Sequence, residues 1–286
     1  MLWDIIGSVE TDLSISQDKP GAILRRPGGV AFNIAQKLST FGLKPIILSA
    51  IGNDAEGNQL IDHCKKLGFD MRYVHLSSKY ATDRYMAIED KSGLFAAVAD
   101  IRCLELECSE IIKPLIDGRL GSFRSPSNSI VIADGNLPSK QLFDMAKCSV
   151  LSNCALKLAP ASAQKVERLK VFCHRPSTVL YCNLSEAEFL AGEKYENSLT
   201  ASRGLLDIGF HRVLVTNGPK FACEAEHNMQ PIIQTPNEVK TLRVTGAGDV
   251  FMASHINAEL TGSSRGEALA KAITEAGNYV SARDCT

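Results

Sequence analysis

One short turn near the C-terminus combines three residues with little or no side chain and a carboxylate. Gly246, Ala247 and Gly248 run directly into Asp249, where the pattern predicts the start of a helix. The first turn of a helix presents unpaired backbone N–H groups and the positive end of the helix dipole, so it attracts anions. Glycines let a phosphate approach the backbone closely. The turn therefore predicts an anion site beside an acidic side chain that could take a proton from an attacking hydroxyl during phosphoryl transfer.

Other ligand-binding turns match this stretch less well. A dinucleotide fingerprint, G-x-G-x-x-G, needs a glycine where this chain has Phe251, and too few residues follow Asp249 for the rest of a nucleotide-binding half. The G-x-x-x-x-G-K-[ST] run of a P-loop does not occur in the sequence. A plain tight turn, in which Asp249 only caps the helix, stays open as an alternative.

Composition and charge disfavour several classes of protein. The 286 residues carry 31 Lys and Arg against 32 Asp and Glu, so nothing indicates the basic surface that nucleic acid or an anionic membrane would require. No apolar run approaches the roughly 18 residues of a membrane span, and the N-terminus does not resemble a signal peptide. We therefore expect a cytoplasmic protein that has neither nucleic acid nor membrane as a partner.

The cysteines and histidines indicate neither a disulfide framework nor a structural metal site. The nine cysteines form no C-x-x-C pair and are odd in number, so we expect buried or half-buried thiols in a reducing compartment. No two of the six histidines lie within one helical turn of each other, which disfavours a structural transition-metal site.

Apolar runs typical of strands alternate with helical patterns along most of the chain. Strands are expected at 5–9, 45–51, 129–133, 178–181 and 212–216, and helices at 29–41, 58–67, 141–146, 162–170, 186–191 and 199–208. This alternation predicts an α/β fold whose central sheet is mostly parallel and covered by helices on both faces. Ligands of such sheets bind beyond the carboxyl ends of the strands, where the candidate residues of this chain cluster.

Two segments break the alternation of strands and helices. Residues 12–26 contain a polar alternation and a Pro-Gly turn, and residues 82–104 read as a hairpin that turns at Lys91-Ser92-Gly93. Because no helix follows these strands, they predict a separate small sheet that serves as a lid, a dimerisation surface, or both. We expect residues 1–286 to form one α/β domain with this β lid.

Further polar motifs open predicted helices or follow predicted strands. They are Gly28-Gly29 with Asn33, Gly52-Asn53-Asp54-Ala55-Glu56-Gly57, Asn183-Leu184-Ser185-Glu186 and Thr216-Asn217-Gly218. Amides and carboxylates suit sugar hydroxyls because they accept and donate hydrogen bonds at short range. In this order, and together with residues 245–249, the motifs resemble the ribokinase-like or PfkB-type carbohydrate kinase family over nearly the whole chain.

The resemblance implies a ribokinase-like three-layer α/β/α fold in which ATP, with Mg²⁺, donates a phosphoryl group to an alcohol. Asp249 then matches the catalytic base, and the amides of Gly246, Ala247 and Gly248 match the anion hole. A homodimer is also implied, and a requirement for a monovalent cation stays open. The small-molecule acceptor would meet residues that match a hydroxyl-binding set: Asp12, Gly28, Gly29 and Asn33.

The nucleotide side of the implied site follows two other predicted strands. Asn183 and Glu186 match the N-x-x-E pair that organises the Mg²⁺ and phosphate end of ATP, Glu186 partly through water. Thr216 and Gly218 match the strand end on the nucleotide side. Structural roles stay open as alternatives: Asn183 could end a strand, Glu186 could stabilise the following helix N-terminus, Asn33 could be a helix-start amide, and the Gly-Gly pair could be only a turn.

Within the family, two stretches most resemble the pseudouridine kinase subgroup, whose members phosphorylate the 5′-hydroxyl of a C-nucleoside. One is residues 81–88 with 96–101, and the other is residues 159–165, which are similar to D-P-V-S-x-x-K. Thr82, Asp100 and Lys165 then match groups that could meet the donors and acceptors of a nucleobase.

Two residues depart from the subgroup's pattern. Glu10 stands where Asn is expected in the N-x-D element that includes Asp12, and Ala159 stands where Asp is expected. A longer, charged side chain at position 10 would repel or re-orient the acceptor. A ribokinase-like kinase with another sugar acceptor, or a non-catalytic sugar or nucleoside sensor with the same fold, are therefore the alternatives.

Overall fold

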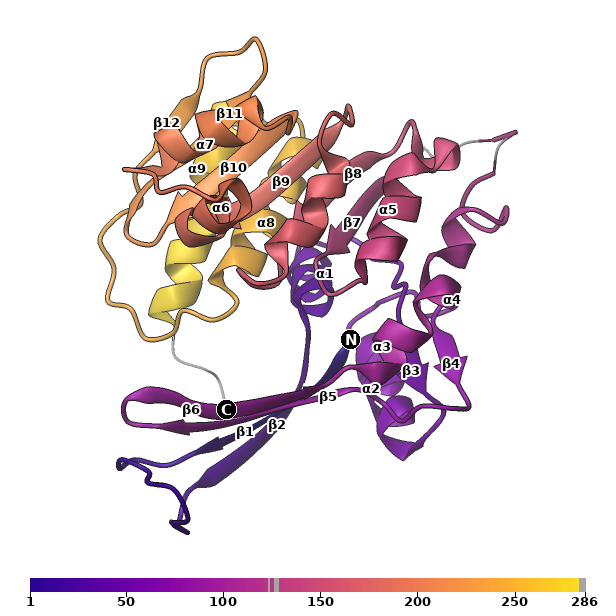
Figure 1. Cartoon of the computed structure of the whole chain (residues 1–286), viewed down its shortest axis with the longest axis vertical. Helices are drawn as coiled ribbons and strands as arrows, with labels where there is room; N and C mark the ends of the chain where they lie inside the picture. The colour runs from indigo at the N-terminus through magenta and orange to yellow at the C-terminus, as the bar shows by residue number, and fades with distance from the viewer. Residues whose placement is uncertain (123, 126–128, 283–286) are drawn as a thin grey trace. The chain divides into compact units, whose positions relative to one another are not determined.

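The computed structural model describes residues 1–122, 124–125 and 129–282 (Figure 1). Their contacts group them into two units. The first unit holds Met1–Phe32 and Lys44–Lys113, and the second holds Asn33–Leu43 and the described residues from Pro114 onward. Helix α1 (Val30–Thr40) begins in the first unit and ends in the second.

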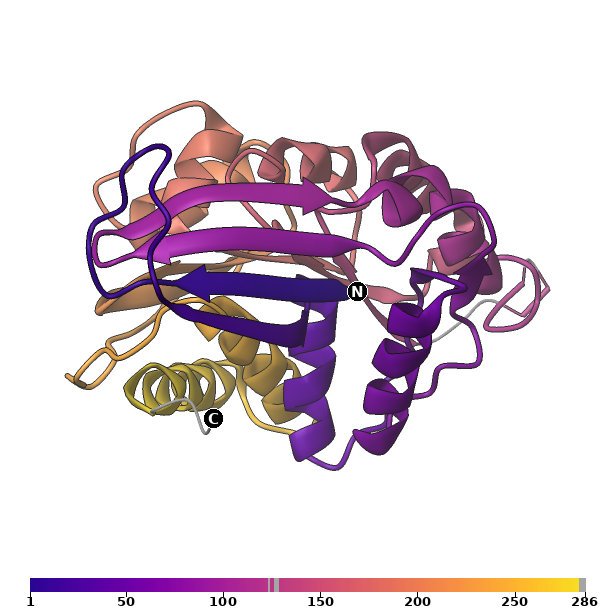
Figure 2. The same cartoon turned by 90° about the horizontal axis from the view of Figure 1, so that it is seen from below.

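A four-stranded sheet dominates the first unit. Its order is β2 (Ala22–Gly28), β1 (Leu2–Ser8), β5 (Arg84–Asp90) and β6 (Gly93–Asp100), which lie side by side in Figure 2. The hairpin predicted within residues 82–104 is therefore present as β5 and β6. The run predicted at 5–9 belongs to this small sheet, with β1 between β2 and β5, and not to the large one. An apolar run cannot indicate which sheet it joins, because strand partners are distant in sequence.

The rest of the first unit is a small α/β layer. Strands β3 (Ala50–Gly52) and β4 (His75–Ser77) pair in parallel, and the helices are α2 (Ala55–Lys66), α3 (Arg102–Leu106) and α4 (Cys108–Ile112). Helix α2 starts three residues before its predicted position because the Asp54 carboxylate caps it, accepting from the Gly57 N–H at 2.7 Å. The run predicted at 45–51 narrows to β3, and before it Ile46 forms only an isolated parallel bridge with Asp70.

The second unit contains a six-stranded sheet. Its order is β12 (Ile232–Gln234), β11 (Lys220–Glu226), β10 (Arg212–Asn217), β9 (Thr178–Asn183), β8 (Ala155–Ala159) and β7 (Ile130–Asp134). Strands β7 to β10 are parallel, and β11 and β12 add an antiparallel edge. Residues of β8 to β11 are buried on consecutive positions, as expected where helices cover both faces. The predicted α/β class with a mostly parallel sheet is confirmed.

The sheet lies between two layers of helices, which makes three layers in all (Figures 1 and 2). One face carries α5 (Ser139–Lys147), α6 (Leu184–Ala191) and α7 (Ser198–Asp207), and the other carries α8 (Ala247–Leu260) and α9 (Arg265–Ser281). The helix predicted at 162–170 is instead a 3₁₀ segment, η3 (Val166–Phe172), which follows Ala161 at a φ of 69°. No helix in the described ranges is long and apolar enough to cross a bilayer.

The cysteine thiols of the described residues are free, and six of these eight are buried. Burial raises the pKa of Cys64 to about 11 and that of Cys103 to about 12, so both side chains stay protonated near neutral pH. They therefore behave as small packing groups, as predicted. Cys285 lies outside the described residues.

Candidate functional site

The Gly246 turn places the end of a loop directly at the start of α8. Gly246 precedes the first helical residue with a φ of 90°, a region that favours glycine. The hydroxyl of Tyr279 on α9 donates to the Thr245 carbonyl at 2.9 Å, and a Cβ on Gly246 would lie 2.6 Å from that hydroxyl oxygen. At Gly248 an added Cβ would meet nothing within 4 Å, so the backbone there faces open space. The Ala247 N–H donates to the Val244 carbonyl at 3.1 Å.

This difference between the two glycines gives a first prediction. Gly246→Ala should destabilise the protein by about 1–2 kcal/mol, because alanine must adopt a left-handed conformation and displace Tyr279. Gly248→Ala should leave the free energy of unfolding unchanged or raise it, since alanine favours a helix, but should weaken ATP binding if phosphate approaches this backbone. Urea unfolding and the KM for ATP measure both effects. An unchanged KM in Gly248→Ala would contradict an anion site at this position.

Asp249 lies in the first turn of α8 and is half-buried. The side-chain amide of Asn33 donates to its Oδ2 at 2.7 Å across 216 residues of sequence. Burial raises the pKa of Asp249 to about 7; the Asn33 hydrogen bond lowers it, and the negative charges of Asp134 and Glu186 raise it further. A carboxyl group with a pKa near neutral pH is well suited to accept a proton from an alcohol.

The pKa of Asp249 gives a second prediction. Only the ionised carboxylate accepts a proton, so kcat/KM should rise with pH through a midpoint near 7. Asn33→Leu removes a hydrogen bond to the charged form, which should move this midpoint to higher pH. The pH dependence of kcat/KM for both proteins checks the shift. A midpoint that stays in place or moves to lower pH would show that Asn33 does not act on the titrating group.

Asn183 and Glu186 form a reciprocal cap at the start of α6. The Glu186 N–H donates to the Asn183 side-chain oxygen, and the Asn183 N–H donates to Glu186 Oε2, both at 2.9 Å. The helix-start role considered above therefore describes these contacts, and the nucleotide role stays a prediction. Burial raises the pKa of Glu186, although the Asn183 N–H bond lowers it. Thr216 ends β10, and Gly218 forms the following turn with a φ of 53°.

Asp134 is a site residue that the sequence analysis missed. It ends β7, accepts a hydrogen bond from the Asn136 N–H at 2.8 Å, and acts electrostatically on Asp249. A carboxylate directly after a predicted parallel strand was the available signal. Together with Glu186 and Asp249 it makes this part of the second unit electronegative, which suits a cation. No cluster of three or more side chains that could hold a metal ion is found in the described ranges.

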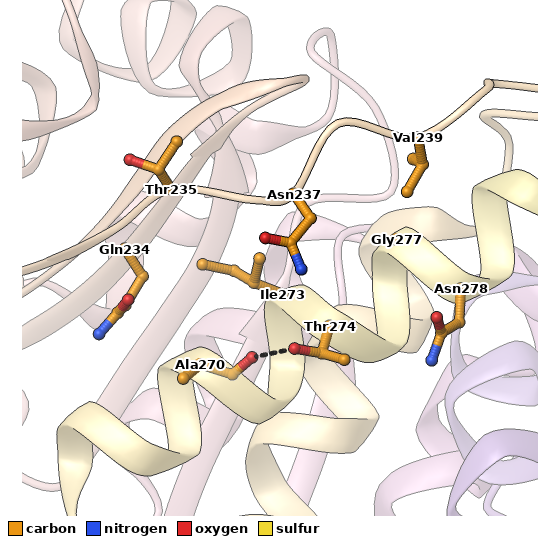
Figure 3. A pocket seen from close by; sticks show the side chains of 9 residues that line it. All are labelled: Gln234, Thr235, Asn237, Val239, Ala270, Ile273, Thr274, Gly277 and Asn278. Atoms are coloured by element: carbon orange, nitrogen blue, oxygen red, sulfur yellow. Dashed lines mark hydrogen bonds between the residues drawn. The ribbon is translucent and has the colours of Figure 1, made fainter.

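A pocket of about 140 Å³ lies between the chain after β11 and helix α9 (Figure 3). Amide side chains and apolar groups line it: Gln234, Thr235, Asn237, Val239, Ala270, Ile273, Thr274, Gly277 and Asn278. Asn278 immediately precedes Tyr279, the residue that contacts the Gly246 turn. The pocket and the Gly246 turn therefore both contact helix α9. The sequence analysis did not predict this pocket.

Lys165 is the one nucleobase candidate located in the second unit. Its ammonium group donates to Asn136 Oδ1 at 2.7 Å. Arg168 reinforces this loop, since its Nη1 lies 3.2–3.3 Å from the carbonyl oxygens of residues 135–137. Asn136 was missed by the sequence analysis, although it follows Asp134 by two residues.

The remaining acceptor candidates belong to the first unit, where each has its own partner. Asp12 is exposed and pairs with Lys91 at 2.7 Å, and Asp100 forms two bonds of 2.8 Å with Arg102. Thr82 is buried, and its hydroxyl donates to the Asp54 side chain at 2.7 Å. These contacts are structural, so the role of the three residues toward a substrate stays a prediction.

Gly28 and Gly29 must be glycines for different reasons. A Cβ on Gly28 would lie 2.1 Å from a carboxylate oxygen of Asp4, so no larger residue fits beside that side chain. Gly29 has a φ of 105°, which only glycine adopts without strain. The pair is thus needed for the path of the chain into α1, and its role toward a sugar stays a prediction.

Comparisons with known proteins identify the family of the chain and support its fold. The family model described as pfkB family carbohydrate kinase matches residues 2–286. A pseudouridine kinase of Escherichia coli strain K12 is 26% identical over 257 residues, which are 87% of this chain and 78% of that protein. A carbohydrate kinase from Agrobacterium tumefaciens has the same fold, with a TM-score of 0.82 at 23% identity over 100% of this chain and 90% of that one. A ribokinase of Arabidopsis thaliana solved with ribose and ATP has a TM-score of 0.75 at 18% identity, covering 99% and 90%. The chain therefore belongs to the pfkB family of carbohydrate kinases, enzymes that transfer a phosphoryl group to an alcohol group of a small molecule.

Proposed function

We propose that this kinase uses ATP and Mg²⁺ to phosphorylate the primary hydroxyl of a ribose-containing small molecule, namely the 5′-hydroxyl of pseudouridine or a related nucleoside. The observation that carries the proposal is Asp249, held by Asn33 in the first turn of α8 with a pKa of about 7, beside the open backbone of Gly248. The similarity to a pseudouridine kinase supports the choice of acceptor.

In the proposed mechanism Asp249 accepts the proton of the acceptor hydroxyl as its oxygen attacks the terminal phosphorus. Asn33 keeps the carboxylate in one orientation by donating to its Oδ2. The backbone at Gly246 and Gly248, at the positive end of the α8 dipole, stabilises charge on the moving phosphoryl group, and the Ala247 N–H joins only by exchanging its bond to Val244. Alignment and charge stabilisation supply most of the catalysis in such a reaction.

The nucleotide would occupy the second unit on both sides of the Gly246 turn. The pocket that includes Asn237, Val239 and Asn278 combines amides with apolar groups, as a purine base requires. Thr216 and Gly218 would contact the nucleotide at the end of β10. Glu186 would hold Mg²⁺ through water, and this ion, when bound, neutralises phosphate charge. A monovalent cation stays an untested addition.

On the acceptor side, the family resemblance leads us to propose roles for the residues of each unit separately. In the second unit, Lys165 would meet the nucleobase and Asn33 the ribose. In the first unit, Thr82 and Asp100 are the proposed nucleobase groups, and Asp12, Gly28 and Gly29 the proposed ribose groups. A lysine ammonium group donates to carbonyl oxygens such as those of a pyrimidine. Another sugar acceptor is the second candidate, because Glu10 and Ala159 depart from the pseudouridine kinase pattern, and Glu10 is exposed and free to change the acceptor's position.

An acceptor panel tests the proposed substrate. Pseudouridine, uridine, ribose and other sugars are incubated with the enzyme and MgATP, and ADP release is followed with product mass. We expect turnover with pseudouridine and a product phosphorylated at the 5′-hydroxyl. The Asp249→Asn variant, purified in parallel, controls for contaminating kinases. If pseudouridine is inert and another sugar is phosphorylated, the acceptor is wrong and the kinase assignment stands.

We also propose that the enzyme is a homodimer formed through the sheet of the first unit. The strand register places Ile23, Met86, Ile88 and Val98 on one face, and all four are exposed, Ile23 at 81% and Val98 at 70%. A shared apolar face of this kind is typical of interaction surfaces. Sedimentation should give twice the chain mass, and Val98→Asp should give the mass of one chain; a monomeric native protein would contradict the dimer.

A further inference from the structure

Helix α8 carries Asp249 but has no polar face over its next two turns. All seven residues from 250 to 256 are buried, and together they cover every side of the helix. Burial of apolar surface is non-directional, whereas hydrogen bonds and ion pairs hold a helix at one rotation about its axis. The polar contacts made from this buried stretch therefore bear on the direction in which Asp249 points.

His255 supplies a directional contact in the buried middle of this helix, between the Asn33 bond to Asp249 and the ion pairs of Glu259. Its ring is fully buried, with Nδ1 3.0 Å from the Tyr181 hydroxyl and Nε2 3.3 Å from Glu224 Oε2. Burial raises the pKa of the Tyr181 phenol well above its usual value, so the phenol keeps its proton and donates it to Nδ1. Nε2 then carries the ring proton and donates to Glu224. One tautomer thus satisfies both bonds.

Glu224 is itself held rigidly, so it can anchor the histidine. Its carboxylate is fully buried on β11 and lies 2.6 Å from both Arg212 on β10 and Arg265 on α9. Burial alone would raise its pKa, but the His255 bond and the Arg212 charge lower the pKa to about 2. The charges facing the ring extend to Glu259, which lies 2.6 Å from Arg212 and 2.7 Å from Lys157.

We propose that Tyr181 and His255 are positioning residues that fix the rotation of α8 and thereby aim the Asp249 carboxylate. The inference rests on the proposed role of Asp249 as base. His255 follows Asp249 by six residues, about 9 Å along the helix axis. Tyr181 precedes Asn183 on β9 by two residues, about 6–7 Å. The Tyr181–His255 bond therefore ties the helix that carries the base to the strand that ends at the proposed nucleotide site.

The test is a double-mutant cycle that uses full-length protein. Tyr181→Phe removes only the hydroxyl, and His255→Leu removes both bonds. We expect kcat to fall about 10-fold in Tyr181→Phe and about 100-fold in His255→Leu. The KM values for ATP and acceptor should stay within twofold of wild type, because the substitutions change the orientation of the Asp249 carboxylate and not substrate binding. In the Asp249→Asn background, neither substitution should change the residual turnover, since the group they aim is gone.

A matched control separates positioning from packing. Ser254 is buried next to His255 on the same helix, and its hydroxyl has no hydrogen-bond partner among the described residues. Ser254→Ala should leave kcat unchanged. If Tyr181→Phe lowers turnover by the same factor with and without Asp249, or has no effect on kcat, the inference is overturned while the kinase assignment stands. If His255→Leu does not fold, Tyr181→Phe alone tests the positioning role. Normal turnover by Asp249→Asn would instead overturn the proposed role of Asp249 as the base.

Discussion

Replacing Asp249 by Asn should lower kcat about 10²- to 10⁴-fold, the range that a lost general base costs. The amide has nearly the same shape, and its oxygen can still accept the bond from Asn33, so the site should stay assembled. The amide cannot take a proton from the acceptor hydroxyl. Steady-state kinetics and calorimetric titration with ATP and with the acceptor should show lost turnover with dissociation constants close to those of wild type.

The stability of Asp249→Asn provides an independent control. The pKa of Asp249 is raised from 3.8 to about 7, so the folded protein binds its proton more tightly than the unfolded chain does. The contribution of Asp249 to the free energy of unfolding is therefore fully present below pH 3.8 and is lost as pH rises through about 7. At pH 8 the variant should melt at a higher temperature than wild type, and the gap should shrink toward pH 4. Full turnover in a folded variant would remove Asp249 as the base.

Features that depend on neighbouring residues were predictable from the sequence. The turn at 246–249 was found because Gly, Ala, Gly and Asp stand in direct succession. Three of the four parallel strands of the large sheet, β7, β9 and β10, read as apolar runs. Strand β8 was missed because Lys157 interrupts its apolar pattern. The structure shows that this lysine is buried and neutralised by Glu259, 102 residues away, and no local pattern reveals that pairing.

The candidate site also combines residues that a local pattern identifies with contacts between distant residues that it does not. The family resemblance pointed to Asn33, but as a sugar-binding group; its hydrogen bond to Asp249 became visible only when α1 and α8 were placed together. Asp134 carried a local signal that was overlooked. The pocket beside α9 carried none, since it combines a loop with a distant helix face. The Tyr181–His255 contact had no local signal either, because its role depends on β9, α8 and β11 together.

Glu224 should be the most sensitive single position for stability. Its buried carboxylate neutralises Arg212 and Arg265, and replacing it by Ala leaves two guanidinium groups partly buried without that partner. Removing one member of a buried ion pair typically costs 3–5 kcal/mol, because the remaining charge stays desolvated. We expect Glu224→Ala to lower the free energy of unfolding by about that amount, measured by urea denaturation at pH 7.

Glu226 offers a matched control on the same strand. It lies 3.7 Å from Arg212 and 3.6 Å from Arg265, at the partly exposed edge of the network, so Glu226→Ala should cost only about 1 kcal/mol or less. The pKa of Glu224 is lowered from 4.5 to about 2, so its contribution is present above pH 4.5 and is lost as pH falls toward 2. The gap between Glu224→Ala and wild type should therefore narrow over that range. If Glu224→Ala and Glu226→Ala lose the same free energy of unfolding, burial does not decide which carboxylate stabilises the network. Glu224 would then not be the rigid partner that His255 needs in order to position α8.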